Sequence, residues 1–429
     1  MKTSQITFCE YIPKAKERTY YECAFAVPEN VCRIDVEYSY QRYDVIPQED
    51  GATLRREVSI VDIALRDGRG EYVGASGAGR GHIHVSAWDS SAGYAKVDTT
   101  AGEWAIIVGA YKIPDAGVTV TYTITFTHKE RTLLLGDTHI HTTASDGKLP
   151  LAEAAQAAKR NGLDFLFVTD HNDYAQNLQI PGLVAEGLIV LPGMEWTHFN
   201  GHAGLLGVPR PIRSPFCVNT PERVYEILTE ARENGAITVL NHPFCPNSGW
   251  RFGMDEGQFD LVELVNGGTV PSANEECLRW WHDRLCRGEK CPVIGGSDYH
   301  SAKYGKNIGQ PATAVYAMSR STADILDALR RGNGYILLWP KGPALWAEAG
   351  GAILGETVPR GTEVHVELTG LQSEDILRII TDKAEEEILC PPDGWQLTLD
   401  RTFTEAAFVR FEVIRYETRI LISNPIYFE

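Results

Sequence analysis

The sequence lacks the features that mark a secreted, disulfide-bonded or membrane-spanning protein. Its nine cysteines are odd in number and include no C-x-x-C pair, which argues against a disulfide framework and a thiolate zinc site. No stretch approaches the apolar length needed to cross a bilayer, and residues 1–21 lack the apolar run and cleavage site of a signal peptide. We therefore expect reduced cysteines, no membrane association and a cytoplasmic location.

Positive charge is also scarce. The chain has 40 lysine and arginine residues against 57 aspartate and glutamate residues, and its formal net charge is −17. Such a chain repels a phosphate backbone unless a basic patch or a bound metal reverses the local field, so bulk nucleic-acid binding is not expected. The 43% hydrophobic and 23% charged residues are typical of a soluble globular protein.

The chain of 429 residues is too long for one ordinary hydrophobic core, and its patterns change twice. Residues 1–130 contain short runs of alternating apolar and polar residues, which predict an N-terminal antiparallel β-sandwich. The glycine-rich segment 74–82 lacks the G-x-G-x-x-G spacing of a phosphate-binding loop and is interpreted as an ordinary loop. The predicted strands here are 23–27, 31–40, 58–65, 103–111 and 118–126.

Residues 131–340 show apolar runs that alternate with helical stretches. This alternation is typical of βα units with a largely parallel sheet, so it predicts an α/β domain. Helices are predicted at 151–162, 221–235, 272–288 and 321–334. Strands are predicted at 133–141, 164–171, 188–195, 202–208, 236–243, 260–266, 292–300 and 312–317.

Residues 341–429 return to short β-rich runs separated by turn residues, which predict a small C-terminal β domain. These runs lie at 362–370, 376–381, 408–416 and 420–428. We therefore expect three domains, with an α/β domain over residues 131–340 between two β regions.

Histidine and acidic residues recur at the carboxyl ends of the predicted central strands. In α/β barrels, the loops at this end build the active site. His139 and His141 lie two residues apart on an extended segment, so their side chains share one face and can bind the same metal. The other residues at or near strand ends are Asp170, His171, Glu195, His202, His242, Asp298 and His300.

A second histidine pair with the same spacing, His82 and His84, lies in the first β region. No comparable cluster of acids and histidines follows it, so the pair is interpreted as two surface or packing residues on a strand. The spacing alone therefore does not identify a metal ligand.

Three residues near the candidate ligands have more than one interpretation. Asp146, in a Ser-Asp-Gly turn, is either a ligand or an ordinary turn residue. Asp170 is expected to cap the following helix or to contact a ligand histidine rather than to bind metal. His198 lies between Glu195 and His202 and is interpreted as a ligand, a proton donor or part of the pocket wall.

The proposed ligand set contains six of the twelve histidines, three carboxylates and no thiolate. These ligand types suit Zn²⁺, Mn²⁺ or Fe²⁺, and nine ligands with one shared carboxylate can hold three divalent metals. Three such ions, three carboxylates and a bridging hydroxide leave a charge of about +2, which would attract a small anionic substrate. The set is His139, His141, Asp146, His171, Glu195, His202, His242, Asp298 and His300.

The motifs around these residues resemble the PHP (polymerase and histidinol phosphatase) superfamily. They are DTHIHTTASDG (137–147), TDHN (169–172), GME (193–195), NHP (241–243) and GSDYH (296–300). The segments GMEWTH and GHAGLLG, with the upstream run GEWAIIVGAYKI, look like the CehA/McbA group of metallohydrolases, which contains carbaryl hydrolase. The resemblance implies a distorted (β/α)7 barrel with a trinuclear metal centre.

The resemblance also implies how three metals share the ligands. Glu195 would bridge the first and second metals. Some members of the family have a histidine where Asp146 stands, so the third site would be weaker or take a different metal. The first metal would be held by His139, His141, Glu195 and Asp298, the second by Glu195, His202 and His242, and the third by Asp146, His171 and His300.

The leading functional hypothesis is hydrolysis of a phosphomonoester or phosphodiester by a hydroxide that bridges two metals. Protonation of the leaving group is assigned to His198, to a metal-bound water or to Asp137, which would lie behind the ligands. Lys148 and Arg251 are candidate phosphate contacts, although lysine and arginine are more often solvated surface residues.

Two other hypotheses remain open at this point. A carbamate or carboxylic ester would be the substrate if Trp196, Phe199 and Trp250 form an aromatic pocket, although aromatic residues there equally suit ordinary packing. The chain could also be a non-catalytic binding module, but such a module would be expected to have lost some of the nine ligands.

Overall fold

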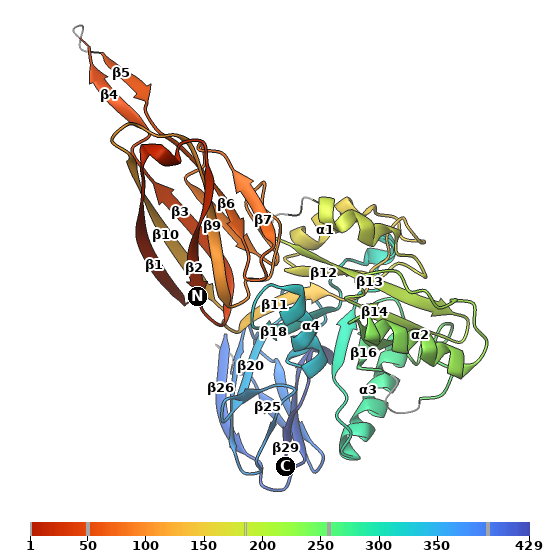
Figure 1. Cartoon of the computed structure of the whole chain (residues 1–429). Coiled ribbons are helices and arrows are strands. Elements are labelled where there is room, and N and C mark those ends of the chain that lie inside the picture. The colour runs from red at the N-terminus through yellow and green to blue at the C-terminus, as the bar shows by residue number, and fades with distance from the viewer. Residues whose placement is uncertain (1, 49–51, 184, 186, 255–258, 392–394) are drawn as a thin grey trace. The chain divides into compact units, whose positions relative to one another are not determined.

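The computed structural model describes residues 2–48, 52–183, 185, 187–254, 259–391 and 395–429. The chain divides into two compact units, one made of Met1–Arg131 and Met318–Thr322, the other of Thr132–Ala317 and Ala323–Glu429. Figure 1 labels many of the elements of both units. Among the described residues, no helix has the length and apolar character needed to span a membrane.

The first unit contains two four-stranded antiparallel sheets that line one hydrophobic core. Period-two alternation sends Ile34 and Val36 into this core from one sheet, and Ile106 and Val108 from the other. One sheet has the order β1 (Thr3–Ile12), β10 (Val118–His128), β3 (Val31–Ser39) and β8 (His82–Ser86); the other has β2 (Tyr20–Val27), β9 (Gly102–Lys112), β6 (Ile60–Arg66) and β7 (Tyr72–Ser76).

The sequence predicted five strands of this unit, now labelled β2, β3, β6, β9 and β10. The strand expected to hold His82 and His84 is β8, whereas β1, β7 and a hairpin of β4 (Tyr43–Pro47) and β5 (Thr53–Glu57) were missed. The glycine-rich segment runs from the end of β7 through a turn to the start of β8, with no helix after it. A short 3-10 helix, Lys14–Lys16, lies between β1 and β2.

The second unit contains a 15-stranded sheet, and seven consecutive strands of that sheet carry the candidate ligands. Strands such as FLFV and ITVLN are buried at every residue and are mostly apolar, as expected of strands with both faces covered. The seven strands are β11 (Thr132–Asp137), β12 (Phe165–Val168), β13 (Ile189–His198), β14 (Gly201–Leu206), β15 (Ile237–Asn241), β16 (Leu261–Asn266) and β17 (Val293–Gly296).

The directions of these seven strands are mixed. The neighbours β11, β12 and β13 are parallel, as are β15, β16 and β17, whereas β14 is antiparallel to both of its neighbours. Beyond the strand ends, Ile140 forms a parallel bridge with Tyr299. The chain that follows β11 therefore meets the chain that follows β17, which brings the two ends of the series together.

The four predicted central helices are confirmed as α1 (Leu151–Arg160), α2 (Pro221–Glu233), α3 (Pro271–Cys286) and α4 (Thr322–Arg331). The first three pack against β12, β15 and β16. Each of the four is followed within two residues by a glycine with φ between 71° and 91°, a conformation that glycine adopts without steric cost. Two 3-10 helices, Ala175–Gly182 and Lys303–Gly305, complete the helical segments of the described residues.

The C-terminal strands continue the central sheet. Strand β19 (Gly334–Leu337) pairs with β28 (Thr418–Ser423), so no break in the sheet marks the predicted boundary at residue 340. The remaining strands of this sheet are β18 (Ala312–Ala317), β22 (Thr357–Val358), β24 (Ile376–Thr381), β25 (Glu385–Leu389), β27 (Phe408–Arg415) and β29 (Ile426–Phe428). A separate sheet contains β20 (Ala344–Ala349), β21 (Ala352–Ile353), β23 (Glu363–Thr369) and β26 (Gln396–Thr402).

The structure thus has extensive sheet and few helices. As predicted, β-rich segments precede and follow the central series in the chain. The regular alternation of a (β/α)7 barrel stays a prediction, because α-helices follow only β11, β14 and β16 within the described part of the series. The boundaries between the three predicted domains, near residues 130 and 340, also stay predictions.

Candidate metal centre

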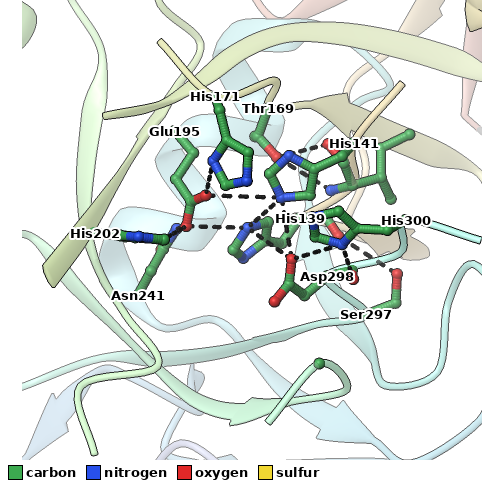
Figure 2. A network of polar contacts seen from close by, with 12 residues as sticks. His139, His141, Thr169, His171, Glu195, His202, Asn241, Ser297, Asp298 and His300 are labelled. Carbon is green, nitrogen blue, oxygen red and sulfur yellow. Dashed lines mark hydrogen bonds and ion pairs between the residues drawn. The ribbon is translucent and has the colours of Figure 1, made fainter. Parts of the chain in front are cut away.

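The predicted ligands gather beyond the ends of the series β11–β17. His139 and His141 follow β11, His171 follows β12, and Glu195 lies near the end of β13. Figure 2 shows these side chains pointing toward one another and toward Asp298. Each of the nine predicted ligands belongs to at least one group of side chains whose nitrogen or oxygen atoms all lie within 4.8 Å of one another.

Four such groups overlap in the described part of the chain. They differ from the sharing implied by the resemblance in three respects: His141 joins the group around Asp146, His139 joins Glu195 and His242, and His171 joins Glu195 and His202. The groups are His139, His141 and Asp298; His139, Glu195 and His242; His171, Glu195 and His202; and His141, Asp146, His171 and His300.

The spacing of the buried donor atoms fits a divalent metal. His141 Nε2 lies 3.2 Å from His139 Nε2 and 3.0 Å from Asp298 Oδ1. Two ligand atoms that each bind a tetrahedral ion at about 2.0 Å lie about 3.3 Å apart, which matches these separations. His139 and His141 are 2% and 0% exposed, so solvent does not explain the convergence of their nitrogens.

Glu195 is the residue that connects the groups. Its buried Oε1 lies 3.2 Å from each of three imidazole nitrogens, on His139, His202 and His242. Its Oε2 lies 2.9 Å from His171 Nδ1 but accepts no hydrogen bond. A buried carboxylate oxygen without a hydrogen bond needs another partner, and a metal shared with the histidines fits that need.

Charges within the cluster shift the pKa values of its members. Burial alone would raise the pKa of Glu195 and Asp298, but the neighbouring histidines, His139 foremost, hold each pKa well below its usual range. Burial alone would lower the pKa of His139, whereas Glu263, Glu195 and Asp298 raise it well above its usual range. Burial dominates at His141 and lowers its pKa. The carboxylates are therefore ionised, as metal ligands must be.

The group around Asp146 is more open to solvent. His300 Nε2 lies 3.2 Å from Asp146 Oδ1, and His171 Nε2 lies 3.7 Å from the same oxygen. The side chains of Asp146, His300 and His171 are 59%, 34% and 24% exposed. Because solvent competes for exposed ligands, we expect this position to bind metal less tightly than the buried ones.

Two of the predicted ligands have a backbone conformation that is uncommon outside glycine. His242 has a φ of 29° and Asp298 has a φ of 49°. Such conformations persist only where surrounding contacts hold them, and they cluster at functional positions. The local backbone thus turns both side chains toward the cluster at a cost in conformational energy.

Asp137 lies behind the ligands, where the sequence placed it. Its Oδ1 accepts hydrogen bonds from the backbone N–H groups of His139, at 3.1 Å, and Ser297, at 3.0 Å. Its Oδ2 accepts one from Gly309 at 2.7 Å. Burial raises the pKa of Asp137 to about 6, although these hydrogen bonds oppose the rise. Asp137 thus fixes the backbone beyond β11 and β17, and its role in proton transfer stays a prediction.

Asp170 holds the loop that carries Asp146. Its Oδ1 accepts hydrogen bonds from the backbone of Thr142 at 2.8 Å and from the hydroxyl of Ser145 at 2.7 Å. Its Oδ2 accepts a third from the Thr142 hydroxyl at 2.7 Å. The carboxylate therefore contacts the segment next to His141, and it belongs to none of the four potential metal groups among the described residues.

Two polar residues of the centre were missed by the sequence reasoning. Asn241 donates from Nδ2 to Glu195 Oε1 at 2.8 Å, and Glu263 lies 2.9 Å from His139 Nδ1. Glu263 stands in the apolar run DLVELVN. A charged residue in such a run is rarely buried without a partner, and that signal could have identified it.

His198 and Trp196 lie in an aromatic cluster. Their rings stack with centroids 5.4 Å apart, and His198 Nδ1 accepts a hydrogen bond from the backbone of Asn200 at 3.1 Å. Trp196 is 0% exposed and Trp250 is 6% exposed, so both pack in the core, whereas Phe199 is 74% exposed. The predicted roles of His198 in proton transfer and of Trp196 in substrate binding stay predictions.

The two candidate phosphate contacts lie on exposed parts of the second unit. Lys148 is exposed, and its backbone N–H donates to the carbonyl oxygen of His300 at 2.8 Å, which places it next to the Asp146 group. Arg251 is also exposed, and its guanidinium donates to the carbonyl oxygen of Pro246 at 3.2 Å.

The histidine pair of the first unit has different surroundings. His82 Nε2 lies 3.0 Å from Asp35 Oδ1, and His84 Nε2 lies 3.0 Å from Asp89 Oδ2. Each imidazole thus has its own carboxylate partner, and neither histidine belongs to a potential metal group of the described residues. All nine cysteines are free thiols.

No family model and no curated protein matches the chain. Similar solved structures include a two-domain protein from Bacteroides vulgatus that contains a predicted PHP-like metal-dependent phosphoesterase, at 18% identity, a TM-score of 0.42, and coverage of 69% of this chain and 96% of that one. A structure from Bifidobacterium adolescentis, named as a metal-dependent phosphoesterase, has 17% identity, a TM-score of 0.30, and coverage of 41% and 91%.

An amidohydrolase from Chromobacterium violaceum, with bound sulfate and no metal, has 16% identity to this chain and a TM-score of 0.32. The similarity covers 47% of this chain and 97% of that one. Two of the three names describe a metal-dependent phosphoesterase, and one of these is PHP-like. At these scores the similarity does not define an activity for this chain.

Proposed function

We propose that this chain is a metal-dependent hydrolase of the PHP type and that it cleaves phosphate esters. The observation that carries the proposal is the convergence of nine imidazole and carboxylate side chains in four overlapping groups. Imidazole and carboxylate together suit Zn²⁺, Mn²⁺ or Fe²⁺, and overlapping groups suit metals that share a ligand. When bound, these metals would supply Lewis acidity and a water of lowered pKa.

In this proposal the ligands form a buried set, which holds two metals, and an open set, which holds a third. His139, His141 and Asp298 would hold one buried metal, and Glu195 would link it to a second metal. The open group around Asp146 would hold a third metal, and the occupancy of this site would vary most with the solution conditions. No serine or cysteine nucleophile is needed for hydrolysis at such a centre.

Charge supports an anionic substrate. The whole chain is strongly acidic, but three divalent metals among three ligand carboxylates make the centre locally positive. Lys148 lies next to the most open group, where its ammonium can contact a non-bridging phosphate oxygen. We therefore propose Lys148 as a substrate contact, and Arg251 as a second contact for larger substrates.

A second candidate substrate is a carbamate or carboxylic ester, in keeping with the CehA/McbA-like motifs. The observation that favours it is the exposed ring of Phe199. This residue lies in the turn between β13, which carries Glu195, and β14, which carries His202. An exposed aromatic ring near a metal centre can bind an aromatic leaving group.

Hydrolysis assays would separate the two candidates. The metal-loaded protein would be tested on p-nitrophenyl phosphate, on bis-p-nitrophenyl phosphate and on 1-naphthyl N-methylcarbamate, with Mn²⁺, Zn²⁺ or Fe²⁺ supplied separately. We expect turnover of a phosphate ester. Turnover of the carbamate alone would contradict the phosphoesterase proposal, and no turnover by a protein that binds less than one metal per chain would contradict both.

Substitution of Lys148 tests the substrate class by a change in the protein rather than in the substrate. Lys148→Gln should raise KM for p-nitrophenyl phosphate with little effect on the carbamate, because only the phosphate needs the positive charge. Lys96→Gln, on an exposed position of the first unit, is the matched control. An equal effect of both substitutions would contradict the proposed phosphate contact.

A further inference from the structure

Glu263 has no place in the predicted ligand set, yet it lies against two of its members. It is 1% exposed on β16, in a strand whose other buried side chains are mostly apolar. The register between β16 and β17 shifts between Glu263 and Val265, and such irregularities often turn a side chain toward a functional site. An ionised carboxylate in this position needs several hydrogen bonds.

Both oxygens of Glu263 accept hydrogen bonds. Oε1 lies 2.9 Å from His139 Nδ1. Oε2 accepts one hydrogen bond from the backbone N–H of His242 at 3.0 Å and another from Asn266 Nδ2 at 3.0 Å. One carboxylate therefore contacts the side chain of one predicted ligand and the backbone of another, and that backbone has the uncommon φ of 29°.

The contact with His139 fixes which of its nitrogens carries a proton. An ionised carboxylate only accepts, so Nδ1 must donate to Glu263. In the neutral form of His139, the form that binds metal, Nε2 is then left with a lone pair, and this atom is the one that lies 3.2 Å from both His141 Nε2 and Glu195 Oε1. A histidine held in this way by a carboxylate is oriented for metal binding and is a stronger ligand.

Asn266 extends the same arrangement. Its Nδ2 also lies 3.4 Å from Asp298 Oδ2, and its Oδ1 accepts hydrogen bonds from the backbone of Gly268 at 2.7 Å and Thr269 at 2.9 Å. Its backbone is paired with Asn274 on α3 through hydrogen bonds of 3.1 Å. The amide thus holds Glu263 in place and is itself held by a turn and a helix.

Tight packing leaves Glu263 little freedom to move. A Cβ atom at Gly296 would lie 2.8 Å from Glu263 Oε1 and 2.5 Å from His139 Cβ. These distances are below normal contact, so only glycine at this position lets the carboxylate and the imidazole approach each other. The geometry of the pair is therefore imposed by three strands, β11, β16 and β17.

We propose that Glu263, supported by Asn266, is a positioning residue that sets the metal affinity of the buried part of the centre. It acts through His139 and the backbone of His242 and does not bind the metal itself. This inference rests on the proposed metal-dependent function and assigns to Glu263 a role outside the nine ligands.

The test is metal affinity, which can be measured without a substrate. Glu263→Gln and Glu263→Ala would be titrated with Mn²⁺ and Zn²⁺ in competition with a chromophoric chelator. In glutamine only the amide oxygen can accept a hydrogen bond, and the amide NH2 group would face a hydrogen-bond donor. Alanine removes both acceptor oxygens. We expect affinity at the tightest position to fall about 10-fold for glutamine and up to about 100-fold for alanine.

A spectroscopic measurement distinguishes positioning from a general loss of structure. The visible absorption bands of bound Co²⁺ should shift in Glu263→Gln, because the orientation and basicity of His139 change. Glu230→Gln is the matched control, since Glu230 accepts backbone hydrogen bonds from Arg213 and Ser214 at 2.7 and 2.9 Å in the same unit. Its affinity and Co²⁺ spectrum should match those of the wild type.

The outcomes separate this inference from the proposed function. Wild-type protein that binds no metal would overturn both. Wild-type binding with unchanged affinity and Co²⁺ bands in Glu263→Gln would overturn the positioning role alone. Equal losses in Glu263→Gln and Glu230→Gln would also overturn it, because the effect would then be one of folding. If the alanine variant fails to fold, the glutamine variant still decides the question.

Discussion

His139 and His141 hold their Nε2 atoms 3.2 Å apart in a region from which solvent is excluded. Two unprotonated imidazole nitrogens repel each other at this distance unless a proton or a cation lies between them. Glu195 Oε1 lies 3.2 Å from His139 Nε2, and Asp298 Oδ1 lies 3.0 Å from His141 Nε2. A divalent metal among His139, His141 and Asp298 would satisfy three of these atoms at once, and the predictions below start from this relationship.

Removal of metal should destabilise the protein. We expect protein treated with a chelator to unfold at a lower temperature than protein in Mn²⁺ or Zn²⁺, because metal binds only the assembled ligands. A metal present at 100 times its dissociation constant adds about 2.7 kcal/mol to the free energy of unfolding. Differential scanning calorimetry with and without metal measures the shift. An unchanged melting temperature, with no metal found by mass spectrometry, would contradict the metal centre.

The two histidine pairs offer a matched comparison. His139→Ala should remove one buried metal and lower the hydrolysis rate more than about 100-fold, since metal ions supply several kcal/mol of transition-state stabilisation. His82→Ala has the same chemical change but removes only the contact with Asp35, so metal content and rate should not change. Metal analysis and rates on the best substrate provide the readout. Equal effects of the two substitutions would contradict the metal centre at His139, because its surroundings would then not distinguish it from His82.

These two pairs also show what sequence could predict. The pattern His-x-His is the same in both, and only the recurrence of histidines and acids at later strand ends separated them. That recurrence was informative because strand ends meet in space. All eight predicted central strands and all four predicted helices are present near their predicted positions, whereas β19 was missed.

Strand direction and strand partners could not be predicted in the same way. β14 is as apolar as its neighbours, and nothing in its composition shows that it runs antiparallel to both of them. The pairing of β19 with β28 joins residues far apart in the chain, and such pairings depend on tertiary contacts rather than on local pattern. Glu263 and Asn241 were missed for a related reason, because their partners lie on other strands.

Gly296 should tolerate no side chain. Gly296→Ala would place a methyl group 2.5 Å from His139 Cβ and 2.8 Å from Glu263 Oε1, so one of the two must move. We expect metal affinity to fall at least about 10-fold, as for other changes behind a metal ligand, and the melting temperature to fall as well. Gly182→Ala is the control, because no described atom lies within 4 Å of its added Cβ. Wild-type affinity in Gly296→Ala would contradict the tight packing at His139.

Asp170 should affect the open part of the centre more than the buried part. Asp170→Ala removes the acceptor that holds Thr142 and Ser145, so the loop with Asp146 should lose its position. We expect the protein to lose one metal per chain and to keep the others. Asp260→Ala is a matched change, since Asp260 accepts from the backbone and hydroxyl of Thr238 at 2.8 and 3.0 Å. Mass spectrometry of the native protein counts the metals, and loss of all metals in Asp170→Ala would contradict a separate role for the loop.

Glu412 gives a prediction on pH that does not depend on the metal. It is 1% exposed and accepts hydrogen bonds from Arg410 and Arg419. Burial alone would raise its pKa, but the two arginines hold that pKa below the usual range. A carboxyl with a lowered pKa in the folded state contributes stability above its unfolded pKa of about 4.3, and the contribution is lost as the pH falls through the folded value.

Glu412→Gln should therefore destabilise the protein by about 3 kcal/mol at neutral pH, because the buried Arg410 and the half-buried Arg419 lose their ionised partner. The difference in the free energy of unfolding between wild type and variant should stay constant from pH 8 to about pH 5 and shrink below about pH 4.5. Urea denaturation of chelator-treated protein measures it. Glu275→Gln, which removes a 46% exposed partner of Arg419, should cost less than about 1 kcal/mol. A difference that does not change with pH would show that Glu412 contributes through packing rather than through its charge.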